Sequence, residues 1–245
     1  MTGNPTLNAN TFTNIHAGPG TATMTVQGTV HKTGLLLLLT IIAASYTWGL
    51  HFAGARETVQ AWTGGGAIAG FIIALITIFK KTWSPVTAPL YAVAEGLLVG
   101  GISSAAAAYS NGIVIEAAML TFGTLAALLA AYTFGIVKAT DNFKRGVIAA
   151  TGGIVILYLA TFVLGFFHVP VPMITGNGLF GIGFSIVVVV IAALNLVIDF
   201  DFIEKGAEAG APKYLEWYAA FSLLVTLIWL YLEILRLLAK LSQRK

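Results

Sequence analysis

Long apolar stretches alternate with short polar connections along most of the chain. Seven of these stretches are close to the roughly 20 residues that an α-helix needs to cross a bilayer. Because lipid cannot satisfy exposed backbone groups, each stretch is predicted to be a helix. The pattern therefore predicts an all-α polytopic membrane protein with seven transmembrane helices. The stretches cover residues 34–53, 63–79, 86–108, 112–136, 146–167, 177–203 and 214–240.

The composition agrees with this pattern. Hydrophobic residues make up 58% of the 245 residues and charged residues 9%, whereas about a quarter of a typical soluble protein is charged. The net charge of +3 comes from basic residues between the apolar stretches. Basic residues in these positions indicate the orientation of the helices in the membrane, and nucleic-acid binding is not expected. The absence of cysteine excludes disulfides, thiolate metal sites and cysteine catalysis.

The first 31 residues differ from the rest of the chain. They are rich in Thr, Asn and Gly, show no apolar period, and carry His16 and His31 as titratable side chains. This composition predicts a disordered or loosely attached polar tail over residues 1–31. The transmembrane domain is then expected to cover residues 32–245.

The distribution of basic residues predicts the orientation in the membrane. Connections on the side of the amino terminus carry eight Lys and Arg residues, against Arg56 alone on the opposite side, so the amino terminus is expected in the cytoplasm. Seven crossings would place Lys240, Arg244 and Lys245 outside, which the same rule disfavours, so a last segment that is re-entrant or crosses only in part is left open. The eight residues are Lys32, Lys80, Lys81, Lys138, Lys144, Arg145, Lys205 and Lys213.

Carboxylates within the apolar stretches are the candidate functional residues. An ionised side chain at bilayer depth costs roughly 2.5 to 3.5 kcal/mol on insertion scales, so such residues usually line an ion path, a relay or a sensor. Arg236 lies three residues after Glu233, and an intrahelical pair would explain both. The candidates are Asp199, Glu233, Asp201 and Glu95, with Glu116 and Arg236 as secondary candidates.

Several of these features also have a structural interpretation. Asp199 and Asp201 point about 200° apart on a helix, so one of them could lie at the interface beside Lys205. Glu116 is near a helix start, where the helix dipole favours an acid. Glu216 is interpreted as a solvated interfacial acid among belt aromatics.

Small residues four apart predict close helix approach at Gly66, Gly70, Gly96 and Gly100.

The segment ALNLVIDFDFIEKGAEAG, followed by LYLEILRLL in the last stretch, resembles the Bax inhibitor-1 family, also called the transmembrane Bax inhibitor motif family, in its bacterial type. PLYAVAEGLLVGGIS and FKRGVIAATGGI resemble that family's third and fifth helices, and the similarity covers roughly residues 30–241. The resemblance implies six helices wrapped around a central last helix. It also implies a pH-sensitive calcium leak channel in a bacterial plasma membrane.

Two acidic motifs carry most of the resemblance. In the family, Tyr/Phe-Asp-Thr-Gln-x-Ile and Leu-Tyr-Leu-Asp supply two aspartates that form a proton-sensitive pair. Asp199 matches the first aspartate, and Glu233 stands in place of the second, after Leu230, Tyr231 and Leu232. The resemblance therefore implies that Asp199 and Glu233 are the pH sensor and contact calcium. Phe200 and Asp201 replace the Thr-Gln step, which adds a carboxylate.

The spacing of these acids predicts their depths. Glu233 lies roughly 28 Å along a helix that starts near Tyr214, whereas Asp199 is near the cytoplasmic end of its own helix. A direct pair would need an interfacial segment over residues 204–217 or a strongly tilted last helix. Otherwise the carboxylates would form two groups at different depths, here called acidic rungs. Two rungs suit a cation path, because an ion must bind well enough to enter and weakly enough to leave. The rungs would be Glu95, Asp199 and Asp201 inside, and Glu116 and Glu233 outside.

These observations favour a pH-gated cation leak channel whose partners are the bilayer, cations and protons. Calcium is expected as the permeant ion and no cofactor is expected. A proton-coupled carrier is an alternative, because buried acids would serve equally as its relay. A non-conducting regulator that binds other membrane proteins is a second alternative. An enzyme is not expected, because HExxH is absent and GISS at 101–104 lacks the following glycine of a membrane serine protease.

Overall fold

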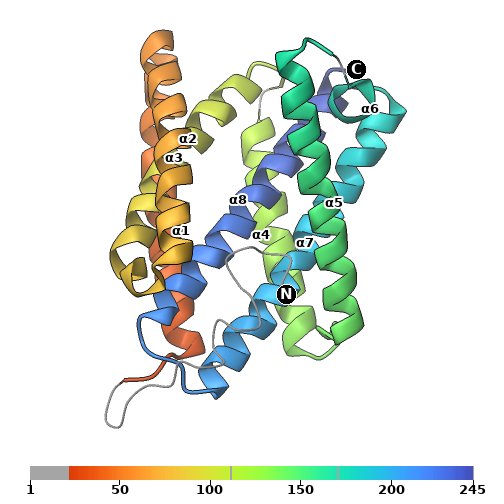
Figure 1. The fold of residues 1–245 in the computed structure, drawn as a ribbon. Helices are drawn as coiled ribbons and strands as arrows, with labels where there is room; N and C mark the ends of the chain where they lie inside the picture. The colour runs from red at the N-terminus through yellow and green to blue at the C-terminus, as the bar shows by residue number, and fades with distance from the viewer. Residues whose placement is uncertain (1–21, 111, 170, 245) are drawn as a thin grey trace. The chain divides into compact units, whose positions relative to one another are not determined.

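The computed structural model describes residues 22–110, 112–169 and 171–244. Within these ranges the regular structure is helical, apart from an isolated bridge between Thr23 and Pro212 (Figure 1). Seven of the described helices are long and apolar enough to cross a membrane, which confirms the predicted fold class. They are α1 (Val26–Phe52), α2 (Arg56–Phe79), α3 (Ser84–Ala106, preceded by η2, Lys81–Trp83), α4 (Ile113–Thr133), α5 (Asp141–Phe166), α7 (Leu179–Glu208) and α8 (Leu215–Ser242); α6 (Pro172–Thr175) is a single turn.

The first helix begins earlier than the composition predicted. Thr25 caps α1 with extended backbone, and its hydroxyl accepts a hydrogen bond from the Gly28 amide at 2.9 Å. Thr29 and Thr33 are buried, and each hydroxyl donates to the carbonyl four residues earlier. Because these hydroxyls bond within the helix, a polar sequence forms a buried helix face. Residues 26–31 are thus the start of α1, while the tail prediction for residues 1–21, with His16, lies outside the described residues.

The described residues form two compact units. The N-terminal unit contains residues 22–105 and 201–225, and the C-terminal unit contains residues 106–200 and 226–244. Helices α7 and α8 each contribute one segment to both units. Each unit therefore combines its own helices with one end of this helical pair.

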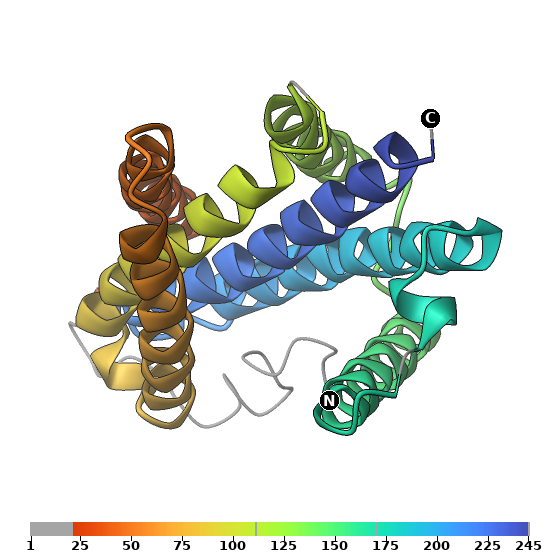
Figure 2. The same ribbon diagram turned by 90° about the horizontal axis from the view of Figure 1, so that it is seen from above.

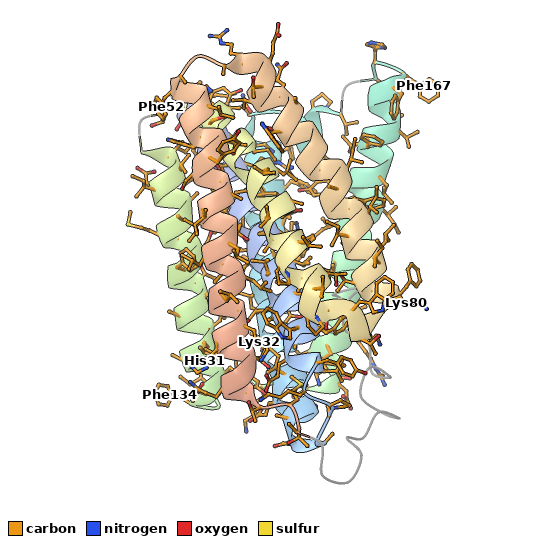
Figure 3. All side chains as sticks on the ribbon, turned by 90° about the vertical axis from the view of Figure 1, so that its left-hand side faces the viewer. His31, Lys32, Phe52, Lys80, Phe134 and Phe167 are labelled. Atoms are coloured by element: carbon orange, nitrogen blue, oxygen red, sulfur yellow. The ribbon has the colours of Figure 1, made fainter. Side chains whose placement is uncertain are left out.

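In the N-terminal unit, α1 and α2 form an antiparallel hairpin. Lys32 and Lys80 lie at one end of this hairpin, and Phe52 lies at the other (Figure 3). The turn between the helices contains Gly54, whose φ of 75° is in the left-handed region that favours glycine. The two lysines therefore share one end of the unit, as their assignment to one side of the membrane requires.

Small residues allow α1, α2 and α3 to approach closely in the N-terminal unit. A Cβ atom at Gly96 would lie 2.5 Å from the Thr40 carbonyl oxygen and 2.7 Å from the Ala43 Cβ. A Cβ atom at Gly66 would lie 2.6 Å from the Ala94 carbonyl oxygen. Both contacts are with the neighbouring helix, so the predicted role of these glycines in helix packing is confirmed.

Replacing Gly66 by alanine should lower the free energy of unfolding by about 1 to 3 kcal/mol, because the added methyl group would overlap backbone of α3 that cannot move freely. Gly65→Ala is the matched control, since a Cβ atom at Gly65 meets nothing within 4 Å. Denaturant unfolding in detergent micelles measures both variants. Equal stability of the two variants would contradict the close approach at Gly66.

In the C-terminal unit, α7 and α8 run side by side in opposite directions (Figures 1 and 2). Hydrogen bonds join them at both ends of this pairing, from Thr226 to Asp199 and from Lys240 to Ser185. Helix α8 is uninterrupted over 28 residues, about 42 Å of helix, so it is not a broken re-entrant segment. In its most apolar part 61% of residues are buried, against 56% in Lys81–Ala106, 50% in α7 and 17% in α4 and in α5; the arrangement of six helices around a central last helix stays a prediction.

Candidate functional site

Asp199 lies on α7 in the C-terminal unit, with its side chain completely buried. The Thr226 hydroxyl of α8 donates a hydrogen bond to Asp199 Oδ2 at 2.6 Å. The neighbouring side chains Leu196 and Ile198 are also fully buried. The structure thus holds a carboxylate and a hydroxyl inside an apolar core.

Asn195 lies one turn before Asp199, on the same side of α7. Its Nδ2 atom donates to Thr151 Oγ1 of α5 at 2.9 Å and to the Ile191 carbonyl at 2.8 Å. Its Oδ1 atom is buried and receives no hydrogen bond from the described residues. An unsatisfied buried acceptor costs roughly 1 to 3 kcal/mol. This oxygen is therefore an available ligand for water or a cation.

Asn195 was not among the predicted candidates, although the sequence carries a signal for it. It is a polar residue within the run GFSIVVVVIAALNLVIDFDF, four residues before Asp199. That spacing places both side chains on one helix face. Thr151 of α5 carries no comparable signal, because only the tertiary structure brings it to Asn195.

Glu233 lies in a second polar cluster of the C-terminal unit, and only 2% of its surface is exposed. The Tyr158 hydroxyl of α5 donates to both of its carboxylate oxygens, at 2.9 and 3.0 Å. Arg236 Nη1 lies 3.0 Å from both oxygens and 2.6 Å from the Tyr158 hydroxyl. The expected intrahelical pair between Glu233 and Arg236 is therefore present. Tyr158 is a third member that the sequence analysis did not identify.

The Asp199 and Glu233 clusters are separate. Asp199 bonds to Thr226, and Thr226 precedes Glu233 on α8 by seven residues, about 10.5 Å of helix. The structure thus agrees with the spacing argument that two level helices keep these acids apart. Among the described residues no three acids or histidines converge on one point. The two acids therefore offer single oxygen ligands at different depths rather than one calcium site.

Asp201 and Glu116 have different surroundings. The Asp201 side chain is only 12% exposed, and its Oδ2 atom lies 2.9 Å from Nζ of Lys205, whose side chain is 57% exposed, so the expected neighbour Lys205 is present. Glu116 is exposed in the first turn of α4. The hydrogen bonds of Glu233 come from its own helix and from Tyr158, and the outer rung of Glu116 and Glu233 stays a prediction.

Glu95 is a half-buried acid of α3 in the N-terminal unit. The Tyr91 hydroxyl, one turn earlier, donates a hydrogen bond to it. Its carboxylate lies against Gly70 of α2, where a Cβ atom would be 2.9 Å from Oε2. Glu95 thus has a neutral hydrogen-bond partner on its own helix and packs against α2. The inner rung that would combine Glu95 with Asp199 stays a prediction.

Glu216 begins α8 in the N-terminal unit, and the interpretation of this residue as a solvated interfacial acid is wrong. Its side chain is completely buried. The carboxylate accepts hydrogen bonds from the Thr25 amide and hydroxyl, both at 2.9 Å, and from Lys213 at 2.8 Å, and it forms an ion pair with Lys32. A Cβ atom at Gly28 would overlap this carboxylate. Glu216 therefore connects α8 to the start of α1.

The chain was compared with known proteins. A family model described as Bax inhibitor 1 like matches residues 4–243. This match covers nearly the whole chain, including the helices that carry Asp199 and Glu233. The comparisons with curated proteins and with solved structures gave no match.

Proposed function

Because the chain belongs to the Bax inhibitor 1 like family of membrane proteins, we propose that it is a pH-sensitive cation leak channel with calcium as the permeant ion. The observation that carries the proposal is the completely buried Asp199 carboxylate, hydrogen-bonded to the Thr226 hydroxyl. An acid kept at bilayer depth usually serves an ion path, a relay or a sensor. The family is not known as an enzyme family, and no catalytic residue is proposed.

The proposed path follows the polar groups of the C-terminal unit. Asp199 supplies a carboxylate, and Asn195 supplies an amide oxygen about 6 Å further along α7. Glu233 supplies a carboxylate about 10.5 Å beyond Thr226 on α8. Carboxylate, amide and hydroxyl oxygens are the ligand types that calcium prefers. Separated single ligands suit conduction, because each holds the ion too weakly to trap it.

Protons are proposed to act on this path through Asp199. When ionised, its carboxylate attracts a cation and accepts the Thr226 hydrogen bond; when protonated, it loses the charge that attracts the cation. Glu233 differs because Arg236 and Tyr158 already contact both of its oxygens. Asp199 is thus the proposed proton sensor, and Glu233 is an acid further along the path whose charge is balanced by Arg236.

The proposed location is a bacterial plasma membrane with the amino terminus in the cytoplasm. The orientation rests on the excess of Lys and Arg in the connections on the amino-terminal side. Lys32 and Lys80 at one end of the N-terminal unit agree with this distribution (Figure 3). Seven crossings by the long helices would then place the end of α8 outside.

Calcium flux into liposomes tests the proposal. Purified protein is reconstituted with a calcium-sensitive dye inside the vesicles, and flux is followed from about pH 6 to about pH 8. Wild-type flux should change with pH, and Asp199→Asn should remove that change, because asparagine cannot ionise. Asp201→Asn should keep the pH dependence, since Asp201 is paired with the exposed Lys205. Glu208→Gln, an exposed acid at the end of α7, is the neutral control.

Three results would contradict the channel. Equal effects of Asp199→Asn and Asp201→Asn on the pH dependence of flux would mean that Asp199 is not the specific proton sensor. Saturating flux with exchange of external for internal calcium would indicate a carrier. No protein-dependent flux from vesicles that contain folded protein would favour the non-conducting regulator.

A further inference from the structure

An open pocket of about 900 Å³ lies in the C-terminal unit beside the Glu233 cluster. Apolar side chains of α5 line one part of it, and basic side chains of α8 line another. The apolar side chains Val155, Leu159 and Phe162 are 49%, 59% and 66% exposed. The basic side chains are those of Arg236 and Lys240. The pocket is thus amphipathic, with an apolar stripe next to cationic groups.

Arg236 has an unused hydrogen-bonding edge in this pocket. Its Nη1 atom contacts Glu233 and the Tyr158 hydroxyl. Its Nε and Nη2 atoms have no hydrogen-bond partner among the described residues, and the side chain is 46% exposed. Two parallel N–H groups on a guanidinium edge match the oxygens of a phosphate or a carboxylate. The free edge of Arg236 is therefore suited to an anion.

Lys240 adds a positive charge to the same pocket. It is 4% exposed, and its Nζ atom donates to the carbonyls of Ile174 and Gly181 and to the Ser185 hydroxyl, at 2.7, 3.0 and 2.9 Å. These three oxygens are neutral, so the hydrogen bonds orient the ammonium group without cancelling its charge. Two basic side chains, Arg236 and Lys240, thus stand against the single acid Glu233 at the polar end of the pocket.

The pocket lies near the depth expected of lipid headgroups. Arg236 is 21 residues from the start of α8 at Leu215, about 31 Å of helix. This length equals the thickness of the hydrocarbon core of a bilayer, roughly 30 Å. The guanidinium therefore reaches the headgroup level at the carboxy-terminal end of α8. The apolar stripe from Phe162 back to Val155 extends along α5 by about 10 Å.

We propose that this pocket binds an anionic phospholipid. The phosphate would contact the free edge of Arg236, close to the charge of Lys240, and an acyl chain would lie along Val155, Leu159 and Phe162. The charge complementarity at one end and the exposed apolar stripe at the other favour a lipid over a small soluble anion. The site adjoins the proposed cation path at Glu233, but its occupancy does not depend on conduction.

Native mass spectrometry of the detergent-purified full chain tests this site. Phosphatidylglycerol and phosphatidylcholine with identical acyl chains are added separately, and inorganic phosphate is added alone in a third arm. Wild type should retain phosphatidylglycerol roughly fivefold better than phosphatidylcholine. Arg236→Gln should lose this preference. Because that variant leaves Glu233 without its cation, the neutral pair Glu233→Gln with Arg236→Gln should lose it as well.

Arg56→Gln is the matched control, since Arg56 is an exposed arginine of the N-terminal unit and its loss should leave the lipid preference unchanged. A preference retained in both Arg236 variants would overturn the proposal. Binding of inorganic phosphate without preference between the two lipids would indicate a soluble anion and would also overturn it. These readouts involve no ion flux, so a failed lipid site and a failed channel are distinguished.

Discussion

Glu216→Ala is expected to lower the free energy of unfolding by about 3 kcal/mol, which is the lower end of the range for breaking a buried ion pair. The carboxylate of Glu216 is completely buried, while the Lys32 side chain is 18% exposed. Removal of the Glu216 carboxylate leaves the Lys32 ammonium group, in a largely buried position, without its anionic partner. It also removes the acceptor for the Thr25 amide at the start of α1. Denaturant unfolding in detergent micelles measures the loss.

Lys213→Ala is the matched control for this cluster. Lys213 contacts the same carboxylate at 2.8 Å, but its side chain is 50% exposed. Solvent screening therefore limits its contribution to less than about 1 kcal/mol. Equal losses in Glu216→Ala and Lys213→Ala, or no loss in Glu216→Ala, would show that the buried carboxylate does not stabilise the N-terminal unit.

Asn195→Leu is expected to reduce calcium flux by about tenfold or more while leaving the fold as stable as the wild type. Asn195 contributes a buried oxygen that receives no hydrogen bond from the described residues. Leucine has the same branching and the same number of side-chain heavy atoms, and it removes this unsatisfied acceptor, which offsets the loss of the hydrogen bond to Thr151, worth about 1 kcal/mol. The loss of one cation ligand worth about 1.4 kcal/mol corresponds to the tenfold change. Liposome flux and denaturant unfolding are measured on the same preparation.

Thr151→Val distinguishes the contribution of the Asn195 Oδ1 atom from that of the hydrogen bond made by Asn195 Nδ2. Valine removes the hydroxyl that accepts from Asn195 Nδ2, whereas the Oδ1 atom of Asn195 remains. Flux should therefore fall less in Thr151→Val than in Asn195→Leu. If Asn195→Leu conducts like the wild type, Asn195 is not part of the path. If it loses flux and stability together, its role is structural.

Hydrophobic patterning predicted the long helices because burial in lipid depends on local composition. The ends were less accurate, since polar residues near the interface extend the helices. Thr29 and Thr33 continue α1 by bonding their hydroxyls within the helix, and α7 continues through charged residues to Glu208. The predicted start of the first span at residue 34 therefore missed the beginning of α1 at Val26.

The candidate site was predicted only where its contacts are local. The pair of Glu233 with Arg236 and that of Asp201 with Lys205 follow from helical spacing, and both are present. By contrast, Tyr158 reaches Glu233 from 75 residues away, and no periodicity reports such a contact. Thr25 reaches Glu216 across 191 residues, which is why Glu216 was interpreted as solvated. Acids at bilayer depth can thus be located from sequence, but their distant partners cannot.

The contact between Gly28 and Glu216 limits the order in which the sequence can change during evolution. A β-carbon at position 28 would occupy the space of the Glu216 carboxylate, which could move only by giving up its bonds to Thr25 and the lysines. Exchange of Gly28 therefore either displaces the Glu216 carboxylate from these bonds or follows the replacement of Glu216 by a smaller residue. Substitutions at positions 28 and 216 are therefore coupled, although the two residues are far apart in the sequence.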